Sequence, residues 1–326
     1  MDAVAGPTVQ QACATSTRAL QMAAQEVAGG TANCALLVMC DRQSNGPVLH
    51  HPDPTAPGGY GVTEHWVPDN MAGDPYAGES MLVTGENVAR RYGIGTVEQH
   101  ELKLLRFQQY QAALADDRAF QRRYMVDAPI FDSRFRRQLG TLAADEGVFP
   151  TTAEGLARLK PVREGGTITF GGQTHPADGN AGAIVTTREH ARELALDAGI
   201  EVELLGFGQA RVEKAHMPMA PAPAAMKALA HARLGIAQVD ALKTHNPFAV
   251  NDIALAQAIG FAWQRMNHYG SSIVWGHPQG PTGLRAVIEL IEELALRGGG
   301  VGLFTGCAAG DTGAALVLRV ADRRPA

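Results

Sequence analysis

Two thiols and an imidazole, each on a predicted turn, form the most informative pattern of this chain. His277 lies in the segment 276–283, GHPQGPTG, and Cys307 follows in a second turn, TGC. Cys13 lies near the other end, where a predicted strand leads into a predicted helix. A thiolate can accept an acyl group as a thioester, and an imidazole can move the proton. The three residues therefore predict acyl transfer through a thioester, with making or breaking of a carbon–carbon bond.

Cys13 is the candidate nucleophile, and His277 is its candidate base. The unpaired N–H groups and the positive dipole end of a helix N-terminus both favour a thiolate. The imidazole could hold an ion pair with that thiolate and later protonate a leaving thiolate. A buried structural cysteine and a structural or exposed histidine are the alternatives for each residue taken alone. The motif around His277 favours the functional interpretation.

The elements that must position these residues follow from the spacing of apolar side chains. Residues 8–13 predict a short strand, and residues 14–27 predict a helix that two glycines stop. The continuous apolar run at residues 34–40 predicts a strand covered on both faces. Residues 45–172 combine loop-rich sequence with one charged helical stretch, which indicates an insertion, and a strand returns at residues 181–187.

The second half of the chain repeats this order of elements. Strands are predicted at residues 202–207, 239–244, 272–275, 301–304 and 314–320, and helices at residues 222–234, 252–259 and 284–296. Each half contains a turn, a helix stopped by glycines, an apolar strand and a later apolar strand, which indicates an internal duplication. Within the insertion, residues 102–125 predict a mixed-charge helix on a solvated face.

The composition argues against several classes of protein. The chain has 326 residues, of which 45% are hydrophobic and 19% are charged, as is typical of a globular protein large enough for two cores. Its net charge of −5 gives no reason to expect a nucleic-acid partner. No apolar run approaches the length of a membrane span, and residues 1–4 show none of the features of a signal peptide.

The cysteines are expected to be free thiols in a reducing compartment, which predicts a cytoplasmic protein. There are four of them, Cys13, Cys34, Cys40 and Cys307. Cys34 and Cys40 bracket a predicted core strand, and their spacing fits no zinc pattern. No metal site is therefore expected.

The motifs resemble those of the thiolase superfamily, of the acetyl-CoA acetyltransferase and sterol-carrier-protein types. That family has an N-terminal nucleophilic Cys, a Gly-His-Pro-x-Gly-x-Ser/Thr-Gly turn and a late Cys in a glycine turn. Arg18 stands five residues after Cys13, as in the family string Cys-Gly-Ser-Gly-Leu-Arg-Ala. The match departs from the family at Ala14, Thr15 and Ser16, which replace Gly, Ser and Gly. The resemblance spans residues 11–320.

The resemblance implies a role for each of four side chains. Cys13 would take the acyl group, His277 would activate Cys13, and Cys307 would move the proton alpha to the thioester carbonyl. By the register of Phe248, His245 takes the place of the family Asn that orients a catalytic water in the first oxyanion hole. An imidazole can donate the same hydrogen bond to the thioester oxygen.

The resemblance also implies an oxyanion hole made by the backbone N–H groups of Cys13 and Ala309. The family run Cys-x-Gly-Gly-Gly-x-Gly is CAAGDTG at residues 307–313, and Ala309 keeps the N–H that the hole needs. Asp311 brings a negative charge near a site that must stabilise an oxyanion.

The fold that the resemblance implies is α/β, a duplicated five-layer α-β-α-β-α arrangement with an inserted loop domain. The domains are predicted as a partial N-terminal half at 1–44, the insertion at 45–172, the return of the N-terminal half at 173–198 and the C-terminal half at 199–326. The first half lacks the two strands that precede residues 272–275 in the second half. Open strand edges leave backbone groups unpaired, so we expect that the N-terminal part is missing or that a partner chain completes the first half.

The function that these residues and this resemblance predict is an acyl-CoA C-acyltransferase. It would carry out Claisen condensation or thiolytic cleavage of a 3-ketoacyl-CoA through an acyl-Cys intermediate. Coenzyme A and its thioesters would be the substrates, with no tightly bound cofactor, and the chain would form a homodimer or homotetramer. The acyl chain length and the physiological direction stay open.

Two alternatives also stay open. A ketoacyl-synthase-like decarboxylating enzyme would use Cys13, His245 and His277 as a Cys-His-His set. Cys307 argues against it, because a decarboxylating enzyme needs no base to make its carbanion. A catalytically degenerate subunit that keeps the fold is the second alternative, which Asp311 and the altered residues after Cys13 favour slightly.

Overall fold

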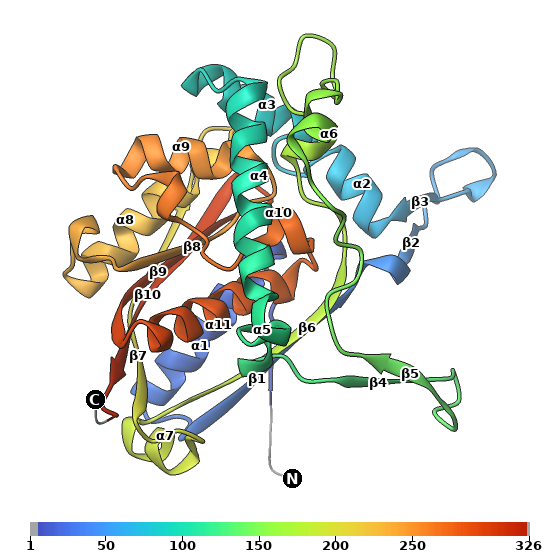
Figure 1. The fold of residues 1–326 in the computed structure, drawn as a ribbon. Helices are drawn as coiled ribbons and strands as arrows, with labels where there is room; N and C mark the ends of the chain where they lie inside the picture. Colours follow the sequence, from blue (N-terminus) through green and yellow to red (C-terminus); the bar gives the residue numbers. More distant parts are fainter. Residues whose placement is uncertain (1–5, 325–326) are drawn as a thin grey trace.

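The computed structural model describes residues 6–324 as two sheets of unequal size with helices between and outside them (Figure 1). Residues 1–5 and 325–326 are outside this range, so the stretch 1–4 that was inspected for a signal peptide has no structural account. None of the helices in residues 6–324 has the length and apolar character needed to cross a membrane.

The larger sheet belongs to the second half and has the strand order β7-β10-β9-β8. Its strands are β7 (Ile200–Arg211), β8 (Ala241–His245), β9 (Gly299–Ala308) and β10 (Thr312–Asp322). β8 runs parallel to β9, and the other two pairs are antiparallel. Four of the five strands predicted for this half are therefore confirmed, with β7, β9 and β10 extending beyond their predicted ends.

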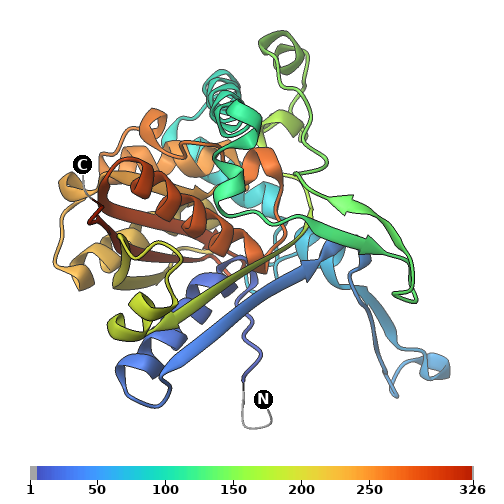
Figure 2. The same ribbon diagram turned by 60° about the horizontal axis from the view of Figure 1, so that its bottom comes forward.

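The smaller sheet belongs to the first half and pairs β1 (Cys34–Arg42) with β6 (Asp178–Thr186). The two strands are antiparallel and lie side by side in Figure 2, although the insertion separates them in sequence. Within residues 6–324 neither strand has a second neighbour, so the outer edge of each is unpaired. In the second half, by contrast, β7 and β8 flank the corresponding pair β9–β10.

Two helices lie between the sheets, α1 (Thr15–Ala28) and α11 (Gly280–Leu296). Their apolar faces form one core with both sheets, including Leu20, Leu290 and Leu316. After α11 ends at Leu296, Gly298, Gly299 and Gly300 all have positive φ and turn the chain into β9. The helices predicted at residues 14–27 and 284–296 are confirmed, and α11 begins four residues earlier than expected.

The outer face of the larger sheet is covered by α8 (Pro221–Ala232) and α9 (Ala249–Ile259), which form a second core with it. This arrangement gives four of the five layers expected. The fifth layer would cover the outer face of β1 and β6, where Leu36, Val38 and Ile184 are exposed.

The prediction that β1 is covered on both faces is wrong. Leu37 and Met39 are buried against the central helices, whereas Leu36 and Val38 are each 70% exposed. Successive side chains of a strand point to opposite faces, so an uninterrupted apolar run leaves half of its side chains in solvent when only one face is covered.

Two short segments predicted as strands adopt other structures. Residues 8–13 run as irregular chain into the 3-10 turn η1 (Ala12–Ala14), where local hydrogen bonds satisfy the backbone of Gln11 and Ala14. Residues 272–275 form the helical turn α10 (Ser272–Trp275). A segment becomes a strand only beside a strand with which it can pair, and neither segment has one within residues 6–324.

The insertion consists of two hairpins and a group of helices. The hairpins pair β2 (Val48–His51) with β3 (Val62–His65), and β4 (Ala128–Phe131) with β5 (Gln138–Leu142), and both extend away from the body in Figure 2. The helices are α2 (Trp66–Ala72), α3 (Met81–Tyr92), α4 (Thr96–Ala113), α5 (Ala115–Arg118) and α6 (Ala153–Ala157), and α7 (Arg188–Leu194) follows β6.

The expectation that residues 102–125 form a solvated face is wrong. α4 crosses α9 and α10 (Figure 1), and Leu102, Arg106 and Tyr110 on it are buried. The guanidinium of Arg106 donates to Oδ2 of Asp252 from Nε at 3.1 Å and from Nη2 at 2.9 Å. A buried ion pair therefore fixes the insertion to the second half.

Candidate active site

The candidate residues come together because several elements end at the same end of the larger sheet. β8 and β9 are parallel with His245 opposite Gly306, so His245 and Cys307 reach the same end of the larger sheet. The first turns of α1 and α11 meet at that end, where the Ser16 hydroxyl donates to the carbonyl oxygen of Gly280. Cys13 just precedes α1, and His277 lies just before α11.

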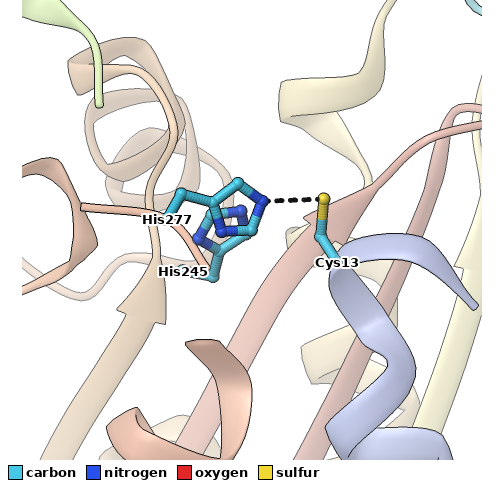
Figure 3. A group of neighbouring side chains, drawn as sticks. All are labelled: Cys13, His245 and His277. Atoms are coloured by element: carbon cyan, nitrogen blue, oxygen red, sulfur yellow. Dashed lines mark hydrogen bonds between the residues drawn. The ribbon is translucent and has the colours of Figure 1, made fainter. Parts of the chain in front are cut away.

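Cys13 and His277 are in direct contact (Figure 3). Cys13 lies in the turn η1, and its Sγ is 3.1 Å from Nε2 of His277. Nδ1 of the same imidazole is 2.7 Å from the hydroxyl oxygen of Thr282. The backbone N–H of His277 donates to the carbonyl oxygen of His175 at 2.8 Å. These contacts fix the orientation of the imidazole toward the thiol.

Gly276 allows His277 to reach this position. Its φ is +95°, and a Cβ there would lie 2.8 Å from the side chain of Ala177 and 2.9 Å from that of His175. A larger residue would strain the backbone and displace the loop that holds His277. These steric limits explain why the residue before His277 in the GHP motif is a glycine.

His245 stacks on His277 behind the thiol. The ring centroids are 4.1 Å apart at an angle of 26° (Figure 3). Nδ1 of His245 is 3.0 Å from Oγ of Ser272, whereas Nε2 is buried without a hydrogen-bond partner in the described part of the chain. Donor atoms of Cys13, His245 and His277 all lie within 4.8 Å of one another. His245 therefore lies within reach of the chemistry at Cys13.

Cys307 is buried near the end of β9 and faces the same cavity as Cys13. The side-chain amide of Asn251 donates to its Sγ at 3.2 Å. The amide oxygen of Asn251 accepts the backbone N–H of Phe248 at 3.1 Å, which fixes the orientation of the amide. Asn251 thus presents an N–H group to the second thiol.

A mainly apolar cavity of about 320 Å³ opens in front of these thiols. Cys13, His277, Cys307 and Ala309 line it, and His245 does not. Much of its wall comes from the insertion and from the second half, through Trp66, Val67, Met71, Met81, Leu82, Met217 and Phe248. The insertion therefore shapes the space in which a substrate would meet Cys13.

Burial decides the protonation of the site. It raises the pKa of the Cys13 thiol to about 12, with a smaller contribution from Asp41, although the N–H groups of Ala309 and of Cys13 itself act in the opposite direction. Burial lowers the pKa of His277 to about 3. Backbone N–H groups thus lower the pKa of the Cys13 thiol, the direction expected at a helix N-terminus, but desolvation outweighs them. Desolvation penalises both charged partners, so the neutral thiol and neutral imidazole prevail.

The other two side chains are neutral for the same reason. Burial, and then the neighbouring His277, hold the pKa of His245 well below its ordinary value. Burial raises the pKa of the Cys307 thiol, and Cys13 and Asp311 contribute further in the same direction. At rest, the two thiols are therefore protonated and the two imidazoles are uncharged.

Asp311 is less disruptive than its charge suggested. Its carboxylate accepts the backbone N–H groups of Ala215 at 2.8 Å and of His216 at 2.9 Å. Its φ of +54° follows the +79° of Gly310, a left-handed turn that favours Gly and Asp. Asp311 therefore has a structural role in the β9–β10 turn, and its effect on the pKa of Cys307 is the smallest of the causes.

Sequence reasoning missed two polar side chains of this site. Asn251 occupies the third position of α9, where its amide oxygen accepts the backbone N–H of the N-cap residue Phe248. A polar residue at that position is a recognisable helix-start signal, so Asn251 could have been found. Ser272 was assigned to a strand, and no local signal indicates that its hydroxyl contacts His245.

Family models match both halves of the chain. A model described as "Thiolase, N-terminal domain" matches residues 1–189, and one described as "Thiolase, C-terminal domain" matches residues 199–320. The N-terminal family model thus matches the chain from residue 1. This match does not support the prediction that the N-terminal part of the first half is missing.

Characterised relatives agree with these models. The chain is 32% identical over 327 aligned positions to the acetyl-CoA acetyltransferase of Escherichia coli, an alignment that covers 97% of this chain and 80% of that enzyme. It is 34% identical over 243 positions to the peroxisomal 3-ketoacyl-CoA thiolase B of Rattus norvegicus, covering 73% of this chain and 56% of that one.

Solved structures show the same fold. The acetyl-CoA acetyltransferase of Bacillus anthracis superposes with a TM-score of 0.88 at 27% identity, covering 98% of this chain and 80% of that one. Human mitochondrial 3-ketoacyl-CoA thiolase superposes with a TM-score of 0.85 at 23% identity, covering 94% and 77%, which supports the fold alone. The sequence motifs, the fold and both family models agree, and the chain belongs to the thiolase family.

Proposed function

We propose that this protein is an acyl-CoA C-acyltransferase that makes or breaks the carbon–carbon bond of a 3-ketoacyl-CoA through an acyl intermediate on Cys13. The observation that carries the proposal is the 3.1 Å contact between Cys13 Sγ and His277 Nε2 at the wall of a cavity that also contains Cys307. Coenzyme A and its thioesters are the substrates, and the chemistry needs no tightly bound cofactor.

In the cleavage direction, Cys13 attacks the 3-keto carbonyl of the substrate while His277 takes its proton. Because both groups are neutral at rest, the proton moves as the sulfur–carbon bond forms. The bond between C2 and C3 then breaks, which leaves an acyl group on Cys13 and a carbanion alpha to the thioester carbonyl. The Cys307 thiol protonates this carbanion and becomes a thiolate.

The second half of the cycle restores the thiols. The Cys307 thiolate takes the proton of an incoming coenzyme A thiol, whose sulfur attacks the acyl group on Cys13. The bond between Cys13 and the acyl group breaks, and His277 returns its proton to the Cys13 sulfur. Every proton is accounted for, and the condensation direction is the same sequence reversed.

The oxygen atoms that become negative during these steps need hydrogen-bond donors. The backbone N–H groups of Cys13 and Ala309 are the proposed donors for one oxyanion, and the fact that both lower the pKa of the Cys13 thiol supports this role. His245 is the proposed donor for the thioester oxygen. Donors that are already oriented toward a developing charge are usually the largest single contribution to catalysis.

The central test is mass spectrometry of the intact protein after incubation with acyl-CoA and with a panel of 3-ketoacyl-CoAs plus coenzyme A. We expect an acyl adduct on Cys13 that is absent from Cys13→Ala. Cys307→Ala should still acylate from acyl-CoA but should no longer exchange carbon–carbon bonds. Full condensation activity of Cys307→Ala would rule out the two-thiol mechanism.

A decarboxylating condensing enzyme is the second candidate. The observation that favours it is the close set of Cys13, His245 and His277. Such an enzyme would use malonyl thioesters and would not need Cys307. Turnover of malonyl-CoA by Cys307→Ala, without turnover of acetyl-CoA by the unmodified protein, would select this candidate.

We also propose that the chain forms a homodimer or homotetramer and acts in the cytoplasm. The exposed apolar side chains of Leu36, Val38 and Ile184 on the open face of β1 and β6 support association. The free state of all four cysteines supports a reducing compartment. Light scattering of the purified protein gives the oligomeric state, and fractionation of the source cells gives the location.

A further inference from the structure

His245 is neutral, so a single ring proton decides what it can do. Its two nitrogens have different surroundings, because Nδ1 is 3.0 Å from the Ser272 hydroxyl and Nε2 has no partner within residues 6–324. Burial, and then the neighbouring His277, hold the pKa of the ring well below its ordinary value, which favours the singly protonated form. A proton on Nε2 makes His245 a donor toward the site, whereas a proton on Nδ1 makes Nε2 an acceptor.

The Ser272 hydroxyl determines which of these forms is present. Its oxygen accepts the backbone N–H of Asn246 at 3.1 Å, which leaves one hydroxyl proton to donate. That proton can go to Oδ1 of Asn246 at 3.1 Å or to Nδ1 of His245 at 3.0 Å. Oδ1 of Asn246 also accepts the N–H of Ile273 at 3.2 Å and is satisfied without the hydroxyl. Nδ1 of His245 has no other partner among the described residues.

We propose that Ser272 is a positioning residue that holds His245 in the Nε2–H form, so that His245 can donate a hydrogen bond to the acyl oxygen. His277 has the opposite arrangement. Its Nδ1 lies 2.7 Å from the Thr282 hydroxyl oxygen, which can accept a proton held on Nδ1 and so leave Nε2 free to take the proton of Cys13. The two stacked imidazoles therefore have complementary roles, with His245 as a donor and His277 as an acceptor. The hydroxyl groups of Ser272 and Thr282 determine which nitrogen of each ring carries the proton. This inference rests on the proposed function.

The arrangement has an energetic reason. If His245 carried its proton on Nδ1, the lone pair of Nε2 would face the developing negative charge of the substrate. The site would then lose a donor and gain a repulsion in a buried, poorly screened location. A hydroxyl that donates to Nδ1 prevents this at no cost in net charge.

A double-mutant cycle tests the role of Ser272. We expect Ser272→Ala to lower kcat at least about tenfold, up to the 10²- to 10³-fold cost of one oxyanion-hole donor, with little change in KM. In a His245→Asn background, where no tautomer exists, Ser272→Ala should cause no comparable further loss. Ser272 also binds the Asn246 N–H, and a purely structural role there would cost equal activity in both backgrounds. Equal losses would overturn the proposal.

Nitrogen-15 NMR of protein labelled at histidine gives an answer that does not depend on turnover. The unmodified protein should show His245 protonated at Nε2, and Ser272→Ala should shift this signal toward the Nδ1–H form. A proton on Nδ1 in the unmodified protein would refute the inference. Absence of acyl-Cys13 in the unmodified protein would instead refute the proposed function, whatever the tautomer.

Discussion

At the scale of single residues, the site is a set of neutral groups whose protons move only when a substrate arrives. Burial keeps Cys13 protonated and His277 unprotonated, so their 3.1 Å contact is a neutral hydrogen bond. In the proposed mechanism the thiol becomes a nucleophile as its proton passes to the imidazole, and the resting protein needs no free thiolate. Such a site avoids reaction of Cys13 with unrelated electrophiles, because the thiolate is the reactive form.

His245 can be tested by two substitutions. His245→Ala should lower kcat by 10²- to 10³-fold, the typical cost of removing one oxyanion-hole donor. His245→Asn should recover part of the loss, because an amide can donate the same hydrogen bond. Steady-state kinetics with acetyl-CoA provide the measurement. Rates near that of the unmodified protein for both variants would place His245 outside the chemistry.

Asn251 should matter for the step at Cys307 and not for the step at Cys13. Its amide donates to the Cys307 sulfur at 3.2 Å, and a hydrogen bond to a charged group contributes about 1.5–3 kcal/mol. Asn251→Ala should therefore slow deuterium exchange at the alpha carbon of acetyl-CoA by about 10- to 100-fold, one factor of ten for each 1.4 kcal/mol. Acylation of Cys13 should stay within a few-fold.

Cys307→Ala supplies the control for Asn251. Once the thiol is absent, Asn251→Ala should have no further effect on the residual exchange rate. A further drop in that background, or an equal loss in Cys13 acylation, would show that Asn251 acts through packing and not through the Cys307 sulfur.

At the scale of elements, one buried carboxylate joins the insertion to the end of β8, where His245 lies. Oδ2 of Asp252 accepts from Arg106 on α4 and from the side-chain amides of Asn246 and Asn267, while Oδ1 accepts from the Thr244 hydroxyl. Thr244 and Asn246 are the neighbours of His245 in sequence. The position of α4 is thereby coupled to the position of His245.

Removal of Arg106 should therefore affect both stability and activity. Arg106→Met leaves the Asp252 carboxylate buried without its cation, and breaking such a pair costs about 3–5 kcal/mol. Urea unfolding should show this loss. In the folded protein kcat should fall, because the end of β8 that positions His245 loses a supporting contact. Arg122→Ala is the matched control, since Arg122 forms an exposed pair with Asp117 that is worth little. Equal stability of the two variants would contradict the coupling.

At the scale of the whole molecule, both halves supply the site. Cys13 comes from the first half and the other three side chains come from the second half, while the insertion provides much of the cavity wall. The central helices α1 and α11 hold these parts together through the core that they share with both sheets. Partial unfolding of either half should therefore remove activity.

The stability of the whole molecule should fall in acid because His277 is held neutral. Its pKa is lowered from 6.5 to about 3, so the unfolded chain binds a proton below pH 6.5 that the native protein does not bind. The contribution of His277 is fully present above pH 6.5 and is lost as the pH falls toward 3. His277→Gln should lose less free energy of unfolding than the unmodified protein between pH 7 and pH 5.

Urea unfolding at both pH values measures this difference. His50→Gln is the control, since His50 is exposed on a hairpin of the insertion, and it should retain the slope of the unmodified protein. The same pH dependence in His277→Gln would mean that other groups account for the acid sensitivity.

The sequence alone determined the family and the set of candidate reactive side chains. The GHP turn, the two thiols and the register of Phe248 identify Cys13, His245, His277 and Cys307, and the structure brings all four into one site. The sheet and helix assignments of the second half follow from apolar spacing within single segments. Apolar spacing predicts such helices and strands because it depends only on residues within the same segment.

Only the tertiary structure decided which faces and charges are buried. β1 has the same apolar run whether one or both faces are covered, and the α4 sequence does not show that Arg106 meets Asp252. Residues 272–275 became a helical turn because no strand is available beside them, and Ser272 gained its contact to His245 as a result. The neutral state of Cys13 likewise depends on desolvation by surrounding elements, a quantity that no local pattern contains.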